Sequence, residues 1–347
     1  MTPLVSVNEL NNLIKENKVK VIDATFAIDP KQPKPDWKKF EEEYYGKFDK
    51  LINHFIREEY VKQHIHGAVH FNMDIGLYVG QFQRYGLYPP KVFEKYARIL
   101  GINNGDHIVV YSRGPLSGML FSSKLWWLLR YYGHENVQVL NGGLAAWIAA
   151  GYPVDGEKVV VKEGNFIARL NPQMLVEFEE LEKKGADGKA LLDKLETEGN
   201  FIARLNPQML VEFEELEKKG ADGKALLDKL ETINFYDARP RGMYTGETPQ
   251  KFPSSGEIPG FHIAGAKNFP STEIVNEHGI KPPAELRKVL QHAGYTEGRA
   301  TIVSCALGIQ AALADLALTT LGIQNVKLYH GSLTEMALRD PARISGK

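Results

Sequence analysis

The chain contains one cysteine, Cys305, and its surroundings suit nucleophilic chemistry. Residues 300–322 read as a strand, a tight turn that begins at Cys305, and a helix. A thiol at such a junction faces the free N–H groups of the helix's first turn, whose partial positive charge favours the reactive thiolate. A lone cysteine is more often a small buried apolar residue. Its place at a strand-to-helix turn, with Gly308 three residues on, favours the nucleophile here.

The elements around this turn alternate along the chain. In the first half, apolar runs typical of strands alternate with amphipathic stretches typical of helices. The expected strands are 19–23, 67–71, 107–111 and 136–140, and the expected helices are 89–101 and 119–133. This alternation predicts an α/β fold with a parallel sheet covered on both faces. Ligands of such sheets bind beyond the carboxyl ends of the strands, where Ser112 and Cys305 are expected.

A diverged repeat relates the two halves of the chain. Four segments of the first half match four of the second in the same order: VIDAT (21–25) with FYDAR (235–239), HIHGA (64–68) with HIAGA (262–266), IVVYS (108–112) with TIVSC (301–305), and NVQVLNGG (136–143) with NVKLYHGS (325–332). The sequence therefore predicts one domain used twice.

A second repeat is perfect. Residues 163–197 and 198–232 are the same 35-residue string, which indicates a recent tandem duplication or an error in sequence assembly. Each copy reads as a short strand, FIARL, followed by a helix that begins at Pro172 in the first copy. Only one copy can precede the strand at 233–237. We expect the second copy to dock there and the first, 163–197, to be an excursion of the linker.

Composition narrows the class of protein. The chain has 42 basic and 43 acidic side chains among 347 residues, and this balance argues against a nucleic-acid binder. It has no apolar run long enough to span a bilayer and no secretory or transit pattern near Met1. One cysteine allows neither an intrachain disulfide nor a cysteine-rich metal site. We expect a soluble, cytosolic protein, with a mitochondrial location as the open alternative.

Together these features resemble the tandem rhodanese-domain sulfurtransferases, the family of thiosulfate and 3-mercaptopyruvate sulfurtransferases. The resemblance covers the chain apart from the extra 35 residues. It is carried by the two HIxGA segments, by the six-residue loop that starts at Cys305, and by WWLLRYYG (126–133), NGGLAAW (141–147) and HGSLTEM (330–336). It implies two rhodanese-like domains, each a parallel sheet flanked by helices. The first, 5–157, would be non-catalytic with Ser112 at the cysteine position, and the second, 198–340, catalytic.

The resemblance also implies a mechanism. A Cys305 thiolate would take sulfur from a donor as a persulfide, and a thiol acceptor such as thioredoxin or glutathione, or cyanide, would remove it. Backbone N–H groups of the loop can cradle the terminal anion, and no metal or organic cofactor is needed. The cradle would be Ala306, Leu307, Gly308, Ile309 and Gln310.

Three further residues are candidates for the site. The resemblance suggests that Arg239 binds the donor's carboxylate or sulfonate, and Arg241 would lie on the same rim. Both could equally be solvated loop arginines. His64 stands where mercaptopyruvate sulfurtransferases carry a histidine proposed to assist proton transfer. Because both halves have a histidine there, a structural hydrogen bond is an equal interpretation for His64.

The loop residues also bear on the choice of donor and on competing functions. Ala306 and Leu307 carry no charge, so 3-mercaptopyruvate, with one carboxylate, is favoured over the thiosulfate dianion. A cysteine-dependent phosphatase would need an arginine in the loop, and residues 305–311 contain none. The alternative that stays open is a rhodanese-like binding or regulatory protein with little or no turnover, because Leu307 and Gln310 depart from the family's usual loops.

Overall fold

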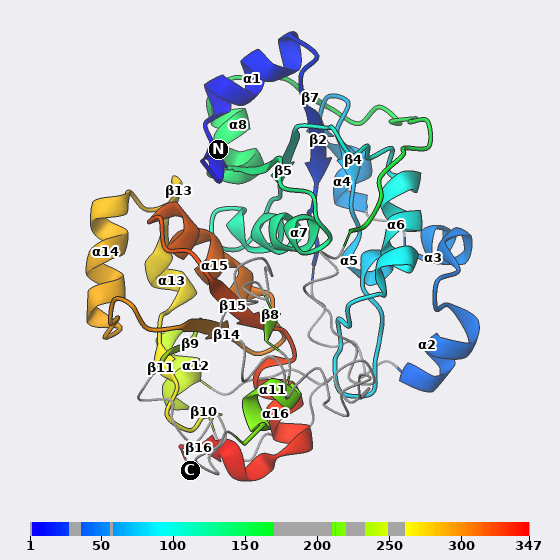
Figure 1. Ribbon diagram of the computed structural model, residues 1–347. Coiled ribbons are helices and arrows are strands. Elements are labelled where there is room, and N and C mark those ends of the chain that lie inside the picture. Colours follow the sequence, from blue (N-terminus) through cyan, green and yellow to red (C-terminus); the bar gives the residue numbers. More distant parts are fainter. Residues whose placement is uncertain are drawn as a thin grey trace, which may run out of the picture.

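The computed structural model describes residues 2–27, 36–55, 58–169, 210–211, 213–219, 233–248 and 261–346 (Figure 1). Each half of the chain is built around a five-stranded sheet in which all paired strands are parallel. The two sheets have the same topology, so the diverged repeat predicted from the sequence is confirmed by the arrangement of the strands.

The first sheet has the order β1-β6-β5-β2-β4. Its strands are β1 (Leu4–Val5), β2 (Lys20–Asp23), β4 (Val69–His70), β5 (Ile108–Tyr111) and β6 (Val137–Leu140). The helices of this half are α1 (Val7–Lys15), α2 (Trp37–Glu43), α3 (Phe48–His54), α4 (Glu58–Lys62), α5 (Met73–Gly76), α6 (Pro90–Ile99), α7 (Met119–Tyr131) and α8 (Gly143–Ala149).

The second sheet has the order β11-β9-β14-β15-β8. Its strands are β8 (Leu210–Val211), β9 (Asn234–Asp237), β11 (Lys267–Asn268), β14 (Thr301–Ser304) and β15 (Val326–Tyr329). The helices described in this half are α11 (Phe213–Glu217), α12 (Arg241–Thr245), α13 (Ser271–Ile274), α14 (Pro283–His292), α15 (Gln310–Thr320) and α16 (Ser332–Arg339), followed by a 3-10 turn, Pro341–Arg343.

Short antiparallel pairs complete each half. They are β3 (His64–Ile65) with β7 (Val154–Asp155), β10 (His262–Ile263) with β16 (Ile344–Ser345), and β12 (Val275–Asn276) with β13 (Gly279–Ile280).

Local signals explain where the main helices begin. Ser6 and Glu9 form a reciprocal capping box that starts α1. Pro90 and Pro283 occupy the first positions of α6 and α14, where a missing N–H costs no hydrogen bond. The equivalent helix starts in the two halves are further evidence of the diverged repeat.

The two halves share one core. A single cluster of buried apolar residues runs from Ile22 in the first half to Leu328 in the second, and α7 packs against α15 at its centre (Figure 1). Residues 311–318 of α15 are all buried, as are residues 119–129 of α7. A helix that is buried on every side needs neighbours on every side, and each of these two helices covers the other.

The duplicated segment divides between the halves. The described part of the first copy, residues 163–169, packs on the first half and is no excursion: Phe166 is buried beside Phe93, and the Ala168 N–H donates to Glu94. These residues form no strand, so the expected FIARL strand is wrong there. The expectations for 170–209 and 220–232 lie outside the described residues.

The second copy supplies the edge of the second sheet. Leu210 and Val211 form β8, which pairs with Leu328 and Tyr329 of β15, and α11 follows. The helical spacing had included Leu210, so that part of the helix prediction is wrong. Pairing with the edge of β15 overrides the local periodicity here, and β1 pairs with β6 at the same place in the first half.

No helix in the described part of the chain is long and apolar enough to cross a membrane.

Within the described residues, the docked parts of the two copies do not overlap. The first copy uses its positions 1–7 (163–169), whereas the second uses positions within 13–22 (210–219). One copy thus contains both docking segments. We predict that deleting 35 residues, which yields the same 312-residue chain whichever copy is removed, keeps the free energy of unfolding within about 1 kcal/mol or raises it. Urea unfolding of both chains measures this, and a clear loss of stability would contradict it.

Candidate active site

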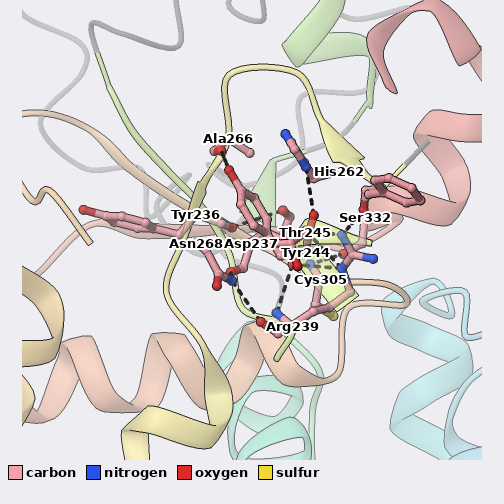
Figure 2. Close-up of polar contacts among 12 residues, drawn as sticks. Tyr236, Asp237, Arg239, Tyr244, Thr245, His262, Ala266, Asn268, Cys305 and Ser332 are labelled. Carbon is pink, nitrogen blue, oxygen red and sulfur yellow. Dashed lines mark hydrogen bonds and ion pairs between the residues drawn. The ribbon is translucent and has the colours of Figure 1, made fainter. Parts of the chain in front are cut away.

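Cys305 lies directly after β14, at the carboxyl edge of the second sheet, as the sequence predicts (Figure 2). Cys305 is 2% exposed, and Ala306, Leu307 and Ile309 are also buried. On one side β14 pairs with β9, so that Ser304 lies opposite Asp237. The cysteine loop and the segment after β9 therefore meet at one edge of the sheet.

The loop turns its carbonyls to one side and its N–H groups to the other. The Cys305 and Ala306 carbonyls accept hydrogen bonds from Leu333 and Thr334 in α16, at 3.1 Å and 3.2 Å. No peptide bond in the described chain is cis, so the N–H groups of the same two peptide units point away from α16.

The loop N–H groups find no partner in the part of the chain that the structure describes. Among the described residues, the backbone N–H groups of 306–309 form no hydrogen bond, although their residues are buried. Buried N–H groups are nearly always paired with an acceptor. A row of unpaired donors beside a thiol is the arrangement that holds an anion.

Ser332 fixes the start of the loop. Its hydroxyl accepts a hydrogen bond from the Cys305 N–H at 3.0 Å and donates one to the Tyr329 carbonyl at 2.8 Å. Its φ of 53° is in the left-handed region, a strained conformation for a non-glycine residue. The first half has Gly143 at the matching position, with a φ of 58°. Ser332 is a site residue that was not predicted from the sequence, and the signal for it is this exchange of glycine for serine between the repeats.

The matching loop in the first half is closed on itself. The Ser112 hydroxyl donates to the Gly118 carbonyl at 2.6 Å and accepts from the Ser122 N–H at 3.1 Å. Gly118 and Gly143 approach the Ser112 carbonyl so closely that an added Cβ would lie 2.4 Å and 2.3 Å from its oxygen. Its Arg113 N–H donates to the Thr25 hydroxyl, and its unpaired N–H groups among the described residues, at Gly114, Leu116 and Ser117, belong to exposed or half-buried residues. The loop after Cys305 differs in that its unpaired N–H groups belong to buried residues.

Comparison with known proteins identifies the fold. The model of the rhodanese-like domain matches residues 6–150 and 220–338. The chain belongs to the rhodanese family. A Caenorhabditis elegans protein named as a thiosulfate sulfurtransferase, mpst-1, is 36% identical over 99% of this chain and 96% of its own length.

Two bacterial matches agree with this. The 3-mercaptopyruvate sulfurtransferase of Escherichia coli K12 is 31% identical over 82% of this chain and 84% of its own length. The crystal structure of SseA, the E. coli 3-mercaptopyruvate sulfotransferase with the rhodanese fold, is similar with a TM-score of 0.65 and 27% identity, covering 96% of this chain and 99% of that one. The expectation of two rhodanese-like domains is therefore confirmed.

Within the second rhodanese domain, Arg239 is already paired. Its guanidinium forms an ion pair with Asp237 at 2.6 Å and also donates to the Phe261 carbonyl, and the residue is 1% exposed (Figure 2). Asn268 binds the carbonyls of both residues of that pair. The expectation that Arg239 offers its fork to a donor carboxylate needs correction, because Asp237 two residues earlier occupies that fork.

Arg241 lies open on the same rim. Its side chain is 61% exposed and contacts Glu273 in the first turn of α13 at 2.8 Å. Gln310, the last residue of the cysteine loop, donates to Ser271 in the same turn at 3.3 Å. The first turn of α13 therefore joins Arg241 to the loop.

His64 belongs to the frame of the first rhodanese domain. Its Nδ1 binds the Tyr60 carbonyl at 2.9 Å, its ring stacks on Tyr60, and its Nε2 lies 3.6 Å from Asp155 in β7. β7 is at the top of Figure 1, whereas β14 is at the lower left. The structure does not bring His64 to Cys305, so its expected place at the site is wrong.

His262 makes the same contacts in the second rhodanese domain. Its Nδ1 binds the Tyr244 carbonyl at 3.0 Å, and its ring stacks on Tyr244. The tyrosine hydroxyl in turn donates to the Ala266 carbonyl, as Tyr60 donates to Ala68 (Figure 2). The histidine that both halves share thus anchors a strand in each.

The two arginines give a matched test. We predict that Arg239→Met lowers the free energy of unfolding by about 3–5 kcal/mol, because it leaves the buried Asp237 carboxylate without its partner. Arg241→Met should change it by less than about 1 kcal/mol, since its ion pair is exposed. Urea unfolding of both variants measures the contrast, and equal stability of the two would contradict the buried ion pair.

Proposed function

We propose that this protein, a sulfurtransferase of the rhodanese family, moves sulfur from a small donor to an acceptor through a persulfide on Cys305. The observation that carries the proposal is the buried row of unpaired N–H groups next to Cys305. Ser112, at the same position of the first domain, lies in a closed loop instead. A persulfide anion needs hydrogen-bond donors out of water, and of the two loops only the second has unpaired N–H groups on buried residues within the described chain.

The proposed transfer balances with 3-mercaptopyruvate as donor. The Cys305 thiolate attacks the donor's thiol sulfur, an S–S bond forms, and the C–S bond breaks with its electron pair going to carbon. The thiol proton of the donor ends on that carbon, which gives pyruvate and a persulfide anion. An acceptor thiolate then attacks the outer sulfur and returns Cys305 to the thiolate.

Charge on the rim favours this donor over thiosulfate. Ala306 and Leu307 offer no cation in the loop itself, and the Arg239 guanidinium is occupied by Asp237. The single carboxylate of 3-mercaptopyruvate can replace Glu273 as the ion-pair partner of the exposed Arg241 guanidinium, which lies beside the loop. We therefore propose Arg241 as the group that binds the donor's carboxylate.

The proposed reaction also needs a sulfur acceptor. A thiol such as thioredoxin or glutathione would regenerate Cys305, and cyanide serves as a laboratory acceptor. No metal, organic cofactor, nucleic acid or membrane takes part in the proposed reaction. The cytosolic location stays a prediction.

The nucleophile is tested by Cys305→Ser. We predict loss of sulfur transfer with the fold intact, because an alcohol keeps its proton where a thiol ionises. The protein is incubated with 3-mercaptopyruvate, then thiocyanate is measured after adding cyanide and the mass of one added sulfur is sought on Cys305. Ser112→Ala is the matched control and should leave turnover unchanged. A wild-type protein that neither gains sulfur nor yields thiocyanate would point to the binding or regulatory alternative.

The donor preference is tested by placing charge in the loop. We predict that Ala306→Arg with Leu307→Lys shifts the ratio of kcat/KM values toward thiosulfate by at least about tenfold, or ~1.4 kcal/mol. A thermal melt confirms that the double variant folds, since both positions are buried. A preference of the wild-type protein for thiosulfate would contradict the proposed donor.

A further inference from the structure

A buried lysine of the first domain lies against the cysteine loop of the second. Lys124, on α7, is 0% exposed, and it lies between the buried Ser123 and the buried Leu125. Its Nζ is 3.0 Å from Nδ1 of His330 in the second domain and 4.4 Å from the centre of the Trp127 ring. An ammonium group is among the costliest groups to bury, so its position calls for a counter-charge.

His330 cannot supply that charge. Its Nε2 lies within hydrogen-bond distance of the Tyr85 carbonyl, which can only accept, so Nε2 carries the proton. Nδ1 is then the acceptor, and Lys124 is the donor. Burial and the nearby Lys124 charge both hold the pKa of His330 well below its usual range, so the imidazole is neutral.

His330 links Lys124 to the loop. Gly308 lies so close to His330 that an added Cβ would be 2.4 Å from the His330 carbonyl oxygen and 3.1 Å from Nδ1. Gly308 has a φ of 72°, so both its space and its conformation exclude a side chain. The loop thus packs directly on the imidazole that accepts the Lys124 hydrogen bond.

Cys305 is the group that can balance Lys124. Among the described residues, the titratable groups on this side of the ammonium are His330, which is neutral, and Cys305, at the start of the loop that packs on His330. Within the described chain Lys124 forms no ion pair with a carboxylate. Burial lowers the pKa of Lys124 to about 7, so near neutral pH the group gains or loses its proton according to the charge beside it.

We propose that Lys124 supplies, from the first domain, the positive charge that balances the anionic sulfur of Cys305, whether thiolate or persulfide. Lys124 is thus a positioning residue that acts across the domain interface. The persulfide part of this statement rests on the proposed function, whereas the thiolate part does not. The first domain then contributes charge to the reaction as well as packing.

Alkylation of the protein reports on the Cys305 thiolate alone, because Cys305 is the single cysteine of the chain. Iodoacetamide alkylation is followed by mass from pH 5.5 to 9 in the wild-type protein and in Lys124→Gln, which keeps a donor for His330 but loses the charge. We expect Lys124→Gln to slow alkylation at pH 7 at least about fivefold. Lys124→Arg should restore the rate to within about twofold.

Controls separate charge from folding. Lys95→Met, at an exposed lysine of α6, should alkylate like the wild-type protein, and thermal melts show which variants fold. If Lys124→Gln does not fold, a Lys124→Met variant and the Lys124→Arg profile carry the comparison. Unchanged alkylation profiles in the folded neutral variants would overturn the proposal.

Alkylation needs no sulfur donor. A wild-type protein that transfers no sulfur but shows the Lys124 effect would therefore disprove the proposed function and leave the thiolate role standing. The reverse result would disprove only the role of Lys124.

Discussion

The packing of α7 against α15 is the contact on which the rest of the molecule depends. Both helices are buried along almost their whole length, so neither could lie exposed to solvent on the surface of a separate domain. Their contact joins the two halves in one core. It also sets the site, because α15 begins at the cysteine loop and α7 carries Lys124. A shift of either helix would change the burial of Cys305 and the position of the cation together.

The two domains show how few exchanges separate a packing loop from a reactive one. The backbone contact from the helix after the last sheet strand is the same in both: Leu144 donates to Ser112, and Leu333 donates to Cys305, each at 3.1 Å. What differs is the side chain at the turn and the residue that holds it. In the second domain a strained Ser332 holds the Cys305 N–H, and the next four N–H groups belong to buried residues and have no partner among the described residues.

The sequence predicts what local patterns determine. The central strands, α6, α7, α15 and the turn at Cys305 lie where the apolar periods placed them, because hydrophobic spacing and helix-start signals are local. The errors concern long-range contacts. Leu210 pairs with a strand more than a hundred residues away, and the occupied fork of Arg239 depends on how the chain turns after β9. Lys124 was overlooked because its partner His330 belongs to the other half of the chain.

The interface between the halves has one further property. Asn141 and His330 occupy the same position of the repeat, and the side chain of each contacts the opposite half. Asn141 accepts a hydrogen bond from the Ile280 N–H at 2.8 Å, next to Gly279. His330 binds the Tyr85 carbonyl, next to Gly86. Both glycines lie four residues before the proline that starts α14 or α6. Such reciprocity is that of an isologous, two-fold dimer. Here the two partners are domains of one polypeptide, so their association is intramolecular and does not weaken on dilution.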